Sequence, residues 1–332
     1  MFNLIRLSFV TIITTLILSF SNTAFAVFDN ETEGAAVAVC STTAAMMTAG
    51  GDCRTTPTKF EISIFENASE GSAVAACSTT AAMMTAGGDC RTTPDKYETS
   101  VFEMGVCTSH PFTNDGTKTD ISTFDSSTCS VTFSATDQTN GSVIDIATSI
   151  GGSIDLVGTS TRPANGTYGF PYIILREKFT VGISIVGFDG NTYNGDASGN
   201  VASGGTLADY TDNLRNFTGG QSKCQSGYAG AVIPIGTIDA FLTNSSLVRS
   251  ETTGGTHYNI GSDTCAKTGR LVGIINLTTP FTITPSTLKL QFNFIVTDYG
   301  INMGDTGSDG YPDDYGSAPF SGTFTITEAP AQ

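Results

Sequence analysis

The sequence predicts an all-β protein, an antiparallel β-sandwich with Greek-key-like connections, and three observations support this. Apolar and polar residues alternate over many short stretches, as in strands with one buried and one solvated face. Clusters of Gly, Asn, Asp and Ser separate these stretches, as turns do. Eight cysteines follow an N-terminal export signal and indicate disulfides. A closed β-barrel is the alternative for strands of this spacing.

Residues 1–26 read as a signal peptide. Arg6 precedes the apolar run Leu7–Phe20, and Ala24-Phe25-Ala26 has the small-residue pattern of a cleavage site. We expect cleavage after Ala26. The mature chain is then expected to contain no transmembrane segment and to be secreted, to the periplasm, the cell surface or the medium.

Residues 27–103 hold an internal duplication. The unit Glu33–Glu66 recurs as Glu70–Glu103, and 28 of 34 positions match. Each unit consists of a Cys-closed loop and a predicted strand, Lys59–Glu66 or Lys96–Glu103. Three of the six differences between the copies fall on one strand face, so the two strands are expected to have somewhat different surroundings. One interpretation is that the duplication adds one strand and one loop, and the other is that the extra strand is offered to a neighbouring subunit.

The eight cysteines are expected to form disulfides between sequence neighbours. This preference is not a proof of connectivity, which the sequence leaves open. The preferred pairs are Cys40–Cys53, Cys77–Cys90, Cys107–Cys129 and Cys224–Cys265.

Residues 104–332 are expected to form the β-sandwich domain. Alternation predicts strands around Cys129–Ala135, Ile144–Ile146, Ile154–Leu156, Tyr168–Ile174, Phe179–Ile185, Ile233–Phe241, Leu288–Val296 and Phe324–Ile326. Residues 189–230 are too polar and too long for an ordinary turn, so they are expected to be a long polar surface loop. Such a loop either carries recognition or is a disordered insertion.

Two resemblances add expectations. The stretch CRTTPDKYETSVFEMGVCTSHPF is similar to the opening of uncharacterised secreted β-rich proteins of marine bacteria, a resemblance that covers about Ala81–Phe188 and implies no activity. The second copy of the repeat carries this motif and the first does not. The second copy is therefore expected to continue into the sandwich.

The acidic stretch Asp305–Gly316 is similar to the calcium loops of thrombospondin type 3 repeats and EF-hands. The resemblance places Asp305, Asp309 and Asp313 as carboxylate ligands and Tyr311 as a carbonyl ligand. Gly307 and Gly316 occupy two further ligand positions, so a low-affinity calcium site is expected. The competing interpretation is a solvated acidic turn.

Composition and motifs narrow the function. With 31 Asp+Glu against 15 Lys+Arg, the net charge of −16 argues against nucleic acid as a partner. The sequence has no GxSxG, HExxH, Walker A or GxGxxG motif, and the two histidines, His110 and His257, are expected in surface turns, so we expect no enzyme. The leading hypothesis is a structural or adhesive cell-surface protein, such as a filament or surface-layer subunit, that self-associates or binds other surface proteins. The alternative is a soluble extracellular ligand-binding module for carbohydrate.

Overall fold

The computed structural model describes residues 61–66, 76–77, 88–112, 123–150, 152–214, 228–233, 235–249, 269–318 and 321–328. The signal peptide, the first Cys-loop with Cys40 and Cys53, and the Cys224–Cys265 pair lie outside these residues. Within them, every regular element is a strand except two 3-10 turns, Ser126–Thr128 and Ile146–Ser149. The all-β prediction is therefore confirmed.

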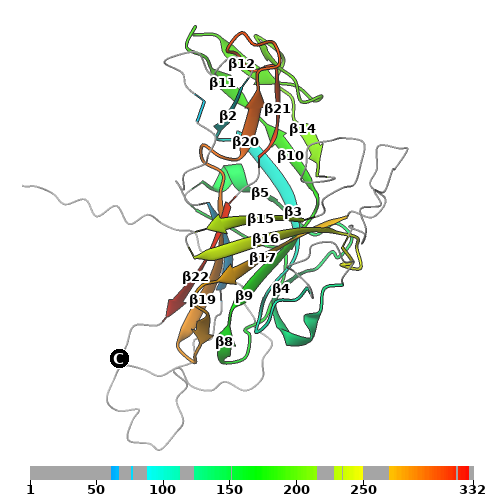
Figure 1. Ribbon diagram of the computed structural model, residues 1–332, viewed down its shortest axis with the longest axis vertical. Helices are drawn as coiled ribbons and strands as arrows, with labels where there is room; N and C mark the ends of the chain where they lie inside the picture. Colours follow the sequence, from blue (N-terminus) through cyan, green and yellow to red (C-terminus); the bar gives the residue numbers. More distant parts are fainter. Residues whose placement is uncertain are drawn as a thin grey trace, which may run out of the picture.

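The largest sheet has ten strands. It contains β3 (Lys96–Cys107), β4 (Cys129–Ala135), β5 (Ser142–Asp145), β7 (Gly158–Ser160), β9 (Phe170–Leu175), β10 (Lys178–Gly182), β14 (Tyr210–Asn213), β15 (Tyr228–Ile233), β16 (Gly236–Thr243) and β17 (Arg270–Leu277). Strand β3 lies in the interior of this sheet. Strands β9 and β10 pair along one edge of β3, and β4 and β5 pair along the other. Strand β3 contains the strand of the second repeat copy and runs on past the predicted boundary between residues 103 and 104, so this copy is part of the main sheet (Figure 1).

A second sheet of four strands forms the opposite layer. Its order is β22 (Ser321–Glu328), β19 (Thr287–Ile295), β1 (Glu61–Glu66) and β6 (Ser153–Ile154). Phe292 and Phe294 of β19 belong to one buried cluster with Ile173 and Leu175 of β9. The two layers share a core in the manner of a β-sandwich. None of the described sheets closes on itself, so the alternative of a closed barrel is wrong.

Three small sheets complete the fold. The first contains β11 (Ser184–Val186), β12 (Thr192–Gly195) and β13 (Val201–Ser203). The second contains β2 (Asp89–Thr92), β20 (Ile301–Gly304) and β21 (Asp314–Ser317). The third pairs β8 (Gly166–Tyr168) with β18 (Phe281–Ile283). The first two sheets lie together at one end of the molecule, at the top of Figure 1, and we call them the tip lobe. Val201 N donates to Asp313 O and Tyr315 N donates to Gly199 O, so backbone hydrogen bonds join the two sheets.

Strands β12, β13 and β14 correct one prediction. They lie within residues 189–230, which the polar composition predicts to be a long surface loop. Tyr315 of β21 holds this segment in a defined structure. The residue is 4% exposed, and its hydroxyl lies 3.1 Å from Asp196 O and 3.2 Å from Ala208 O. Gly195 makes room for it, because a Cβ there would stand 2.5 Å from the Tyr315 ring. Tyr315 thus lies more than 100 residues after the segment that it holds in place.

The ten-stranded sheet is buried on both faces at its centre, whereas the alternation of apolar and polar residues predicts one solvent-exposed face. Ile173 and Leu175 of β9 face the sandwich core, while Tyr172 and Ile174 belong to a second cluster on the outer face. Phe112 and Phe124 cover this outer face; the Phe112 ring lies 4.4 Å from the Phe241 ring. The outer face is buried there because Phe112 and Phe124, which lie between β3 and β4 in the sequence, pack against it.

Candidate functional site

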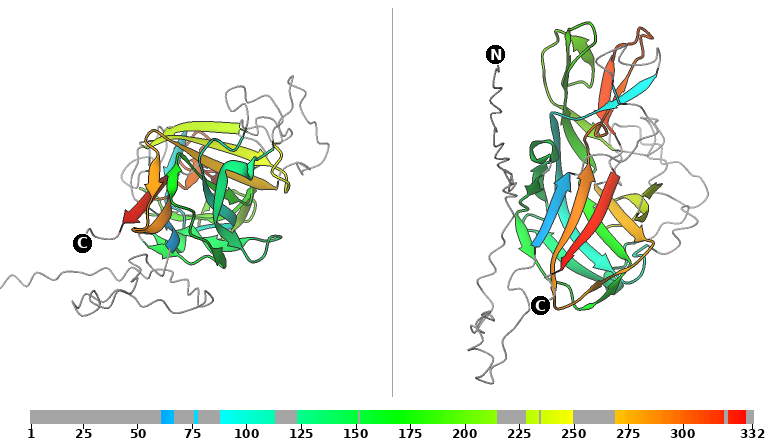
Figure 2. Two further views of the ribbon diagram at one scale, coloured as in Figure 1. Left: turned by 90° about the horizontal axis from the view of Figure 1, so that it is seen from below. Right: turned by 90° about the vertical axis from the view of Figure 1, so that its left-hand side faces the viewer.

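Strand β1, from the first repeat copy, occupies an inner position in the four-stranded sheet. It pairs parallel to β19 over six residues, from Glu61 opposite Lys289 to Glu66 opposite Phe294. Its other edge pairs antiparallel with β6 at two residues only. Every other pairing between two strands of the described part of the chain is antiparallel. One further parallel contact is the single bridge between Ala76 and Arg91. In Figure 2 (right), β1, β19 and β22 lie side by side.

Strand β19 depends on β1 for the backbone hydrogen-bond partners along one of its two edges. Its core residues Leu290, Phe292 and Phe294 are at most 2% exposed, and they stand opposite Ile62, Ile64 and Glu66 in the register. Buried backbone N–H and C=O groups need partners, and β22 supplies them on one edge only. Removal of β1 would therefore leave an unpaired edge beside the core.

The two copies of the repeat strand have different surroundings, as expected. The second copy is part of β3, where Glu98 is paired with Thr180 on one edge and Asp145 on the other. The first copy lies between β19 and β6 in the opposite layer. Two closely similar sequences thus occupy a central strand of one sheet and an inserted strand of the other.

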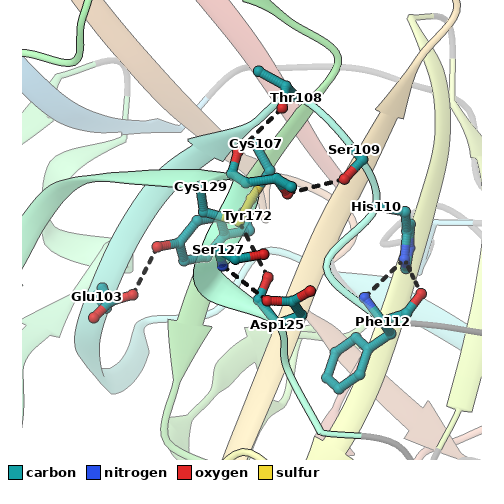
Figure 3. Close-up of a disulfide and its surroundings, with 11 residues drawn as sticks. Glu103, Cys107, Thr108, Ser109, His110, Phe112, Asp125, Ser127, Cys129 and Tyr172 are labelled. Atoms are coloured by element: carbon teal, nitrogen blue, oxygen red, sulfur yellow. Dashed lines mark hydrogen bonds between the residues drawn. A yellow bond between two sulfur atoms is a disulfide. The ribbon is translucent and has the colours of Figure 1, made fainter.

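The two predicted disulfides within the described residues are both present: Cys77–Cys90 and Cys107–Cys129. Cys107 and Cys129 stand directly opposite each other on β3 and β4 (Figure 3). The Asp125 carboxylate accepts a hydrogen bond from Ser127 N and caps the 3-10 turn before Cys129. The disulfide closes the segment that covers the outer face of the ten-stranded sheet.

His110 is not a surface turn residue, which corrects the sequence prediction. Its side chain is 11% exposed, and its Nε2 lies 3.5 Å from Asp239 Oδ2. Its Nδ1 accepts a hydrogen bond from Phe112 N at 3.1 Å (Figure 3), and its ring meets Phe241 edge-on. The sequence motifs gave no sign of this pair, because Asp239 is remote in the chain.

The His110–Asp239 pair is one element that acid–base catalysis uses. Among the described residues, the polar contacts of His110 are the Phe112 backbone and Asp239, without a serine, threonine or cysteine nucleophile. The Asp239 carboxylate also accepts a hydrogen bond from the Asn276 amide. The 3.5 Å contact between His110 Nε2 and Asp239 is not a hydrogen bond; it places His110 beside β16. The absence of enzymatic activity stays a prediction, and His257 lies outside the described residues.

The predicted calcium loop lies in the tip lobe, where its carboxylates bind the loop's own backbone. Asp305 is 4% exposed and accepts hydrogen bonds from Gly310 N at 2.8 Å and Asp309 N at 3.2 Å. Asp313 accepts from Gly307 N and the Thr306 hydroxyl. The chain turns at Gly310 with φ of +87°.

No group of three or more Asp, Glu, His or Cys side chains is placed to share a metal ion in the described part of the chain. Asp309 accepts a hydrogen bond from Tyr311 N, and the Tyr311 ring stacks on Phe188 and on Tyr193, with ring centroids 5.3 and 5.2 Å apart. These contacts connect the loop to the neighbouring sheet of the tip lobe. Calcium binding at Asp305, Asp309, Tyr311 and Asp313 stays a prediction.

Comparison of the chain with family models, curated proteins and solved structures finds no match. Among the described residues, no helix has the length and apolar character needed to cross a membrane. The functional argument therefore depends on the geometry of this chain.

Proposed function

We propose that the protein is a secreted structural or adhesive subunit of the cell surface that assembles by exchange of strand β1. The observation that supports this most directly is the parallel insertion of β1 between β19 and β6. Donor-strand complementation between subunits uses the same arrangement, in which an added strand completes a sheet that its own chain leaves open.

Exchange between chains preserves every contact that β1 makes within one chain. The strand that leaves one subunit fills the same position between β19 and β6 of the next subunit, so assembly costs little beyond the ordering of the connecting chain. The duplication supports this role, because the second copy already supplies β3 to the main sheet. The first copy is the strand available for exchange.

The test uses paired cysteine variants at register partners. Ser63 stands opposite Gln291 in the β1–β19 ladder. When Ser63→Cys and Gln291→Cys are made in separate chains and the two proteins are assembled together, oxidation should give a heterodimer on a non-reducing gel. A matched mixture of Ser63→Cys with Ala202→Cys, on exposed β13, should give none.

One outcome of this cross-linking experiment would refute strand exchange. If both substitutions in one chain give only an intramolecular bond, and the mixture gives no cross-link, β1 stays in its own subunit and exchange is refuted. Light scattering of the mature protein measures the assembly independently, and a strict monomer at all concentrations would contradict the proposal.

A second candidate is extracellular carbohydrate binding, favoured by one observation in the tip lobe. Phe188 is 46% exposed, and its ring is stacked on Tyr311 beside Asp189 and Asn191. A flat aromatic face with neighbouring polar groups suits a sugar ring. Tyr193, which stacks on Tyr311, is only 7% exposed, so Phe188 offers the accessible aromatic surface. Phe188→Ala should abolish retention on a polysaccharide matrix if this candidate holds.

A further inference from the structure

A cavity of about 390 Å³ lies between the two layers of the sandwich. Strands β9, β15, β16 and β17 line one side of it, on the inner face of the ten-stranded sheet. Phe292 of β19, Tyr299 and Ala318 line the other side. Its lining also includes Gly230 and Ala231 of β15, which are exposed, so the cavity opens toward solvent.

Small residues create this space. On β16 the lining residues are Ile238 and Ala240, and on β17 they are Leu271 and Gly273, so each strand places a small residue beside a large one on the same face. An apolar ligand that fills this space would cover apolar side-chain surface and gain van der Waals contacts.

The lining determines the chemistry of that occupant. None of the residues that line the cavity is charged. Of the three hydroxyl groups in the lining, that of Tyr97 donates to Ala318 O at 3.2 Å and that of Ser317 donates to Asp212 Oδ2 at 2.7 Å. The third belongs to Tyr299, which is half-buried. An ionised ligand would lose its hydration here without gaining a charged partner from the lining.

We propose that this cavity binds a small, neutral, apolar molecule, aromatic or aliphatic, held by van der Waals contact. The volume lies within the range of roughly 300–1,000 Å³ typical of small-molecule sites. The site shares Phe292 with the β1–β19 ladder, and exchange of β1 between subunits keeps that pairing, so the two proposals can be tested separately.

The experiment is a fluorescence titration of the mature protein with N-phenyl-1-naphthylamine, a neutral dye that brightens in apolar surroundings. The parent should bind it saturably. Ala240→Leu fills the cavity from β16 and should weaken dye binding at least tenfold while raising the melting temperature. The control, Ala202→Leu, makes the same change on an exposed residue of β13 and should leave binding unchanged.

Two results would overturn the proposal: no saturable binding by the parent, or equal binding by Ala240→Leu and Ala202→Leu. Near-ultraviolet circular dichroism establishes that the variants are folded. If Ala240→Leu does not fold, Gly273→Ala replaces it, because a Cβ at Gly273 makes only an ordinary 3.4 Å contact with Ile173. Gly273→Ala should weaken binding by a smaller factor, and unchanged binding in that variant would count against the site.

Discussion

Glu103 on β3 is a carboxylate in a mostly apolar setting. It accepts a hydrogen bond from the Tyr172 hydroxyl at 2.7 Å (Figure 3). Burial raises the pKa of Glu103 above its ordinary value, and the bond from Tyr172 offsets only part of this. The folded protein therefore holds this proton more tightly than the unfolded chain does. The stability that Glu103 contributes is greatest below the ordinary Glu pKa and is lost as the pH rises through the higher folded pKa.

Glu103→Gln should raise the melting temperature at pH 7 by a few degrees at most. The amide oxygen still accepts from Tyr172, and no charge has to be desolvated. The difference from the parent should disappear near pH 4, where the parent carboxyl is protonated. Thermal melts between pH 4 and 8 measure this. A lower melting temperature for Glu103→Gln at every pH would show that the carboxylate stabilises the fold.

At the scale of single elements, the Cys107–Cys129 disulfide holds the segment that covers the outer face of the ten-stranded sheet. Phe124 of this segment lies 5.0 Å from the Tyr172 ring, edge-on. Thr108 N donates to Thr128 O and continues the β3–β4 pairing beyond the disulfide. The segment therefore depends on the disulfide and on aromatic packing together.

Replacing Cys107 and Cys129 by alanine should lower the free energy of unfolding by roughly 3 kcal/mol, the chain-entropy value for a loop of about 20 residues. Urea unfolding measures the loss. The same change at Cys77 and Cys90 is the comparison. It should leave the near-ultraviolet signal of the outer aromatic cluster unchanged, since neither cysteine touches that cluster. Equal stability of the parent and the Cys107/Cys129 variant would contradict the prediction.

The sequence predicted some elements and missed others for physical reasons. Strand β19 and both described disulfides followed from alternation and cysteine spacing. Strand β17 was missed because its run Leu271–Ile275 is buried on both faces and does not alternate. The parallel partner of β1 could not be predicted either, because β19 lies more than 200 residues away and the local sequence carries no sign of it.

At the scale of the whole molecule, negative charge concentrates in the tip lobe. Residues 184–214 contain four Asp and no Lys or Arg, and residues 290–318 contain five Asp and no Lys or Arg. Lys96 forms an ion pair with Asp209 at 2.8 Å, which offsets one of these charges. The net charge of the chain is −16, so mutual repulsion opposes the compact state at low salt.

Raising NaCl from about 10 to about 150 mM, across which the Debye length falls from roughly 30 to 8 Å, should raise the melting temperature. CaCl₂ at the same ionic strength tests the calcium prediction separately. A further rise that magnesium does not reproduce, and that Asp309→Ala abolishes, is the expected sign of binding at the loop. Identical melts in all three salts would leave the loop a plain acidic turn.

The parallel ladder between β1 and β19 also has a mechanical consequence. If β1 comes from a neighbouring subunit, tension along a filament pulls β1 lengthwise past β19. The six paired positions then resist together, whereas a pull across the strand would open them one after another. A short strand inserted in this way resists a force along its length but separates readily when it is pulled away from one end. A filament joined by such strands would withstand shear from a moving medium and could still be disassembled.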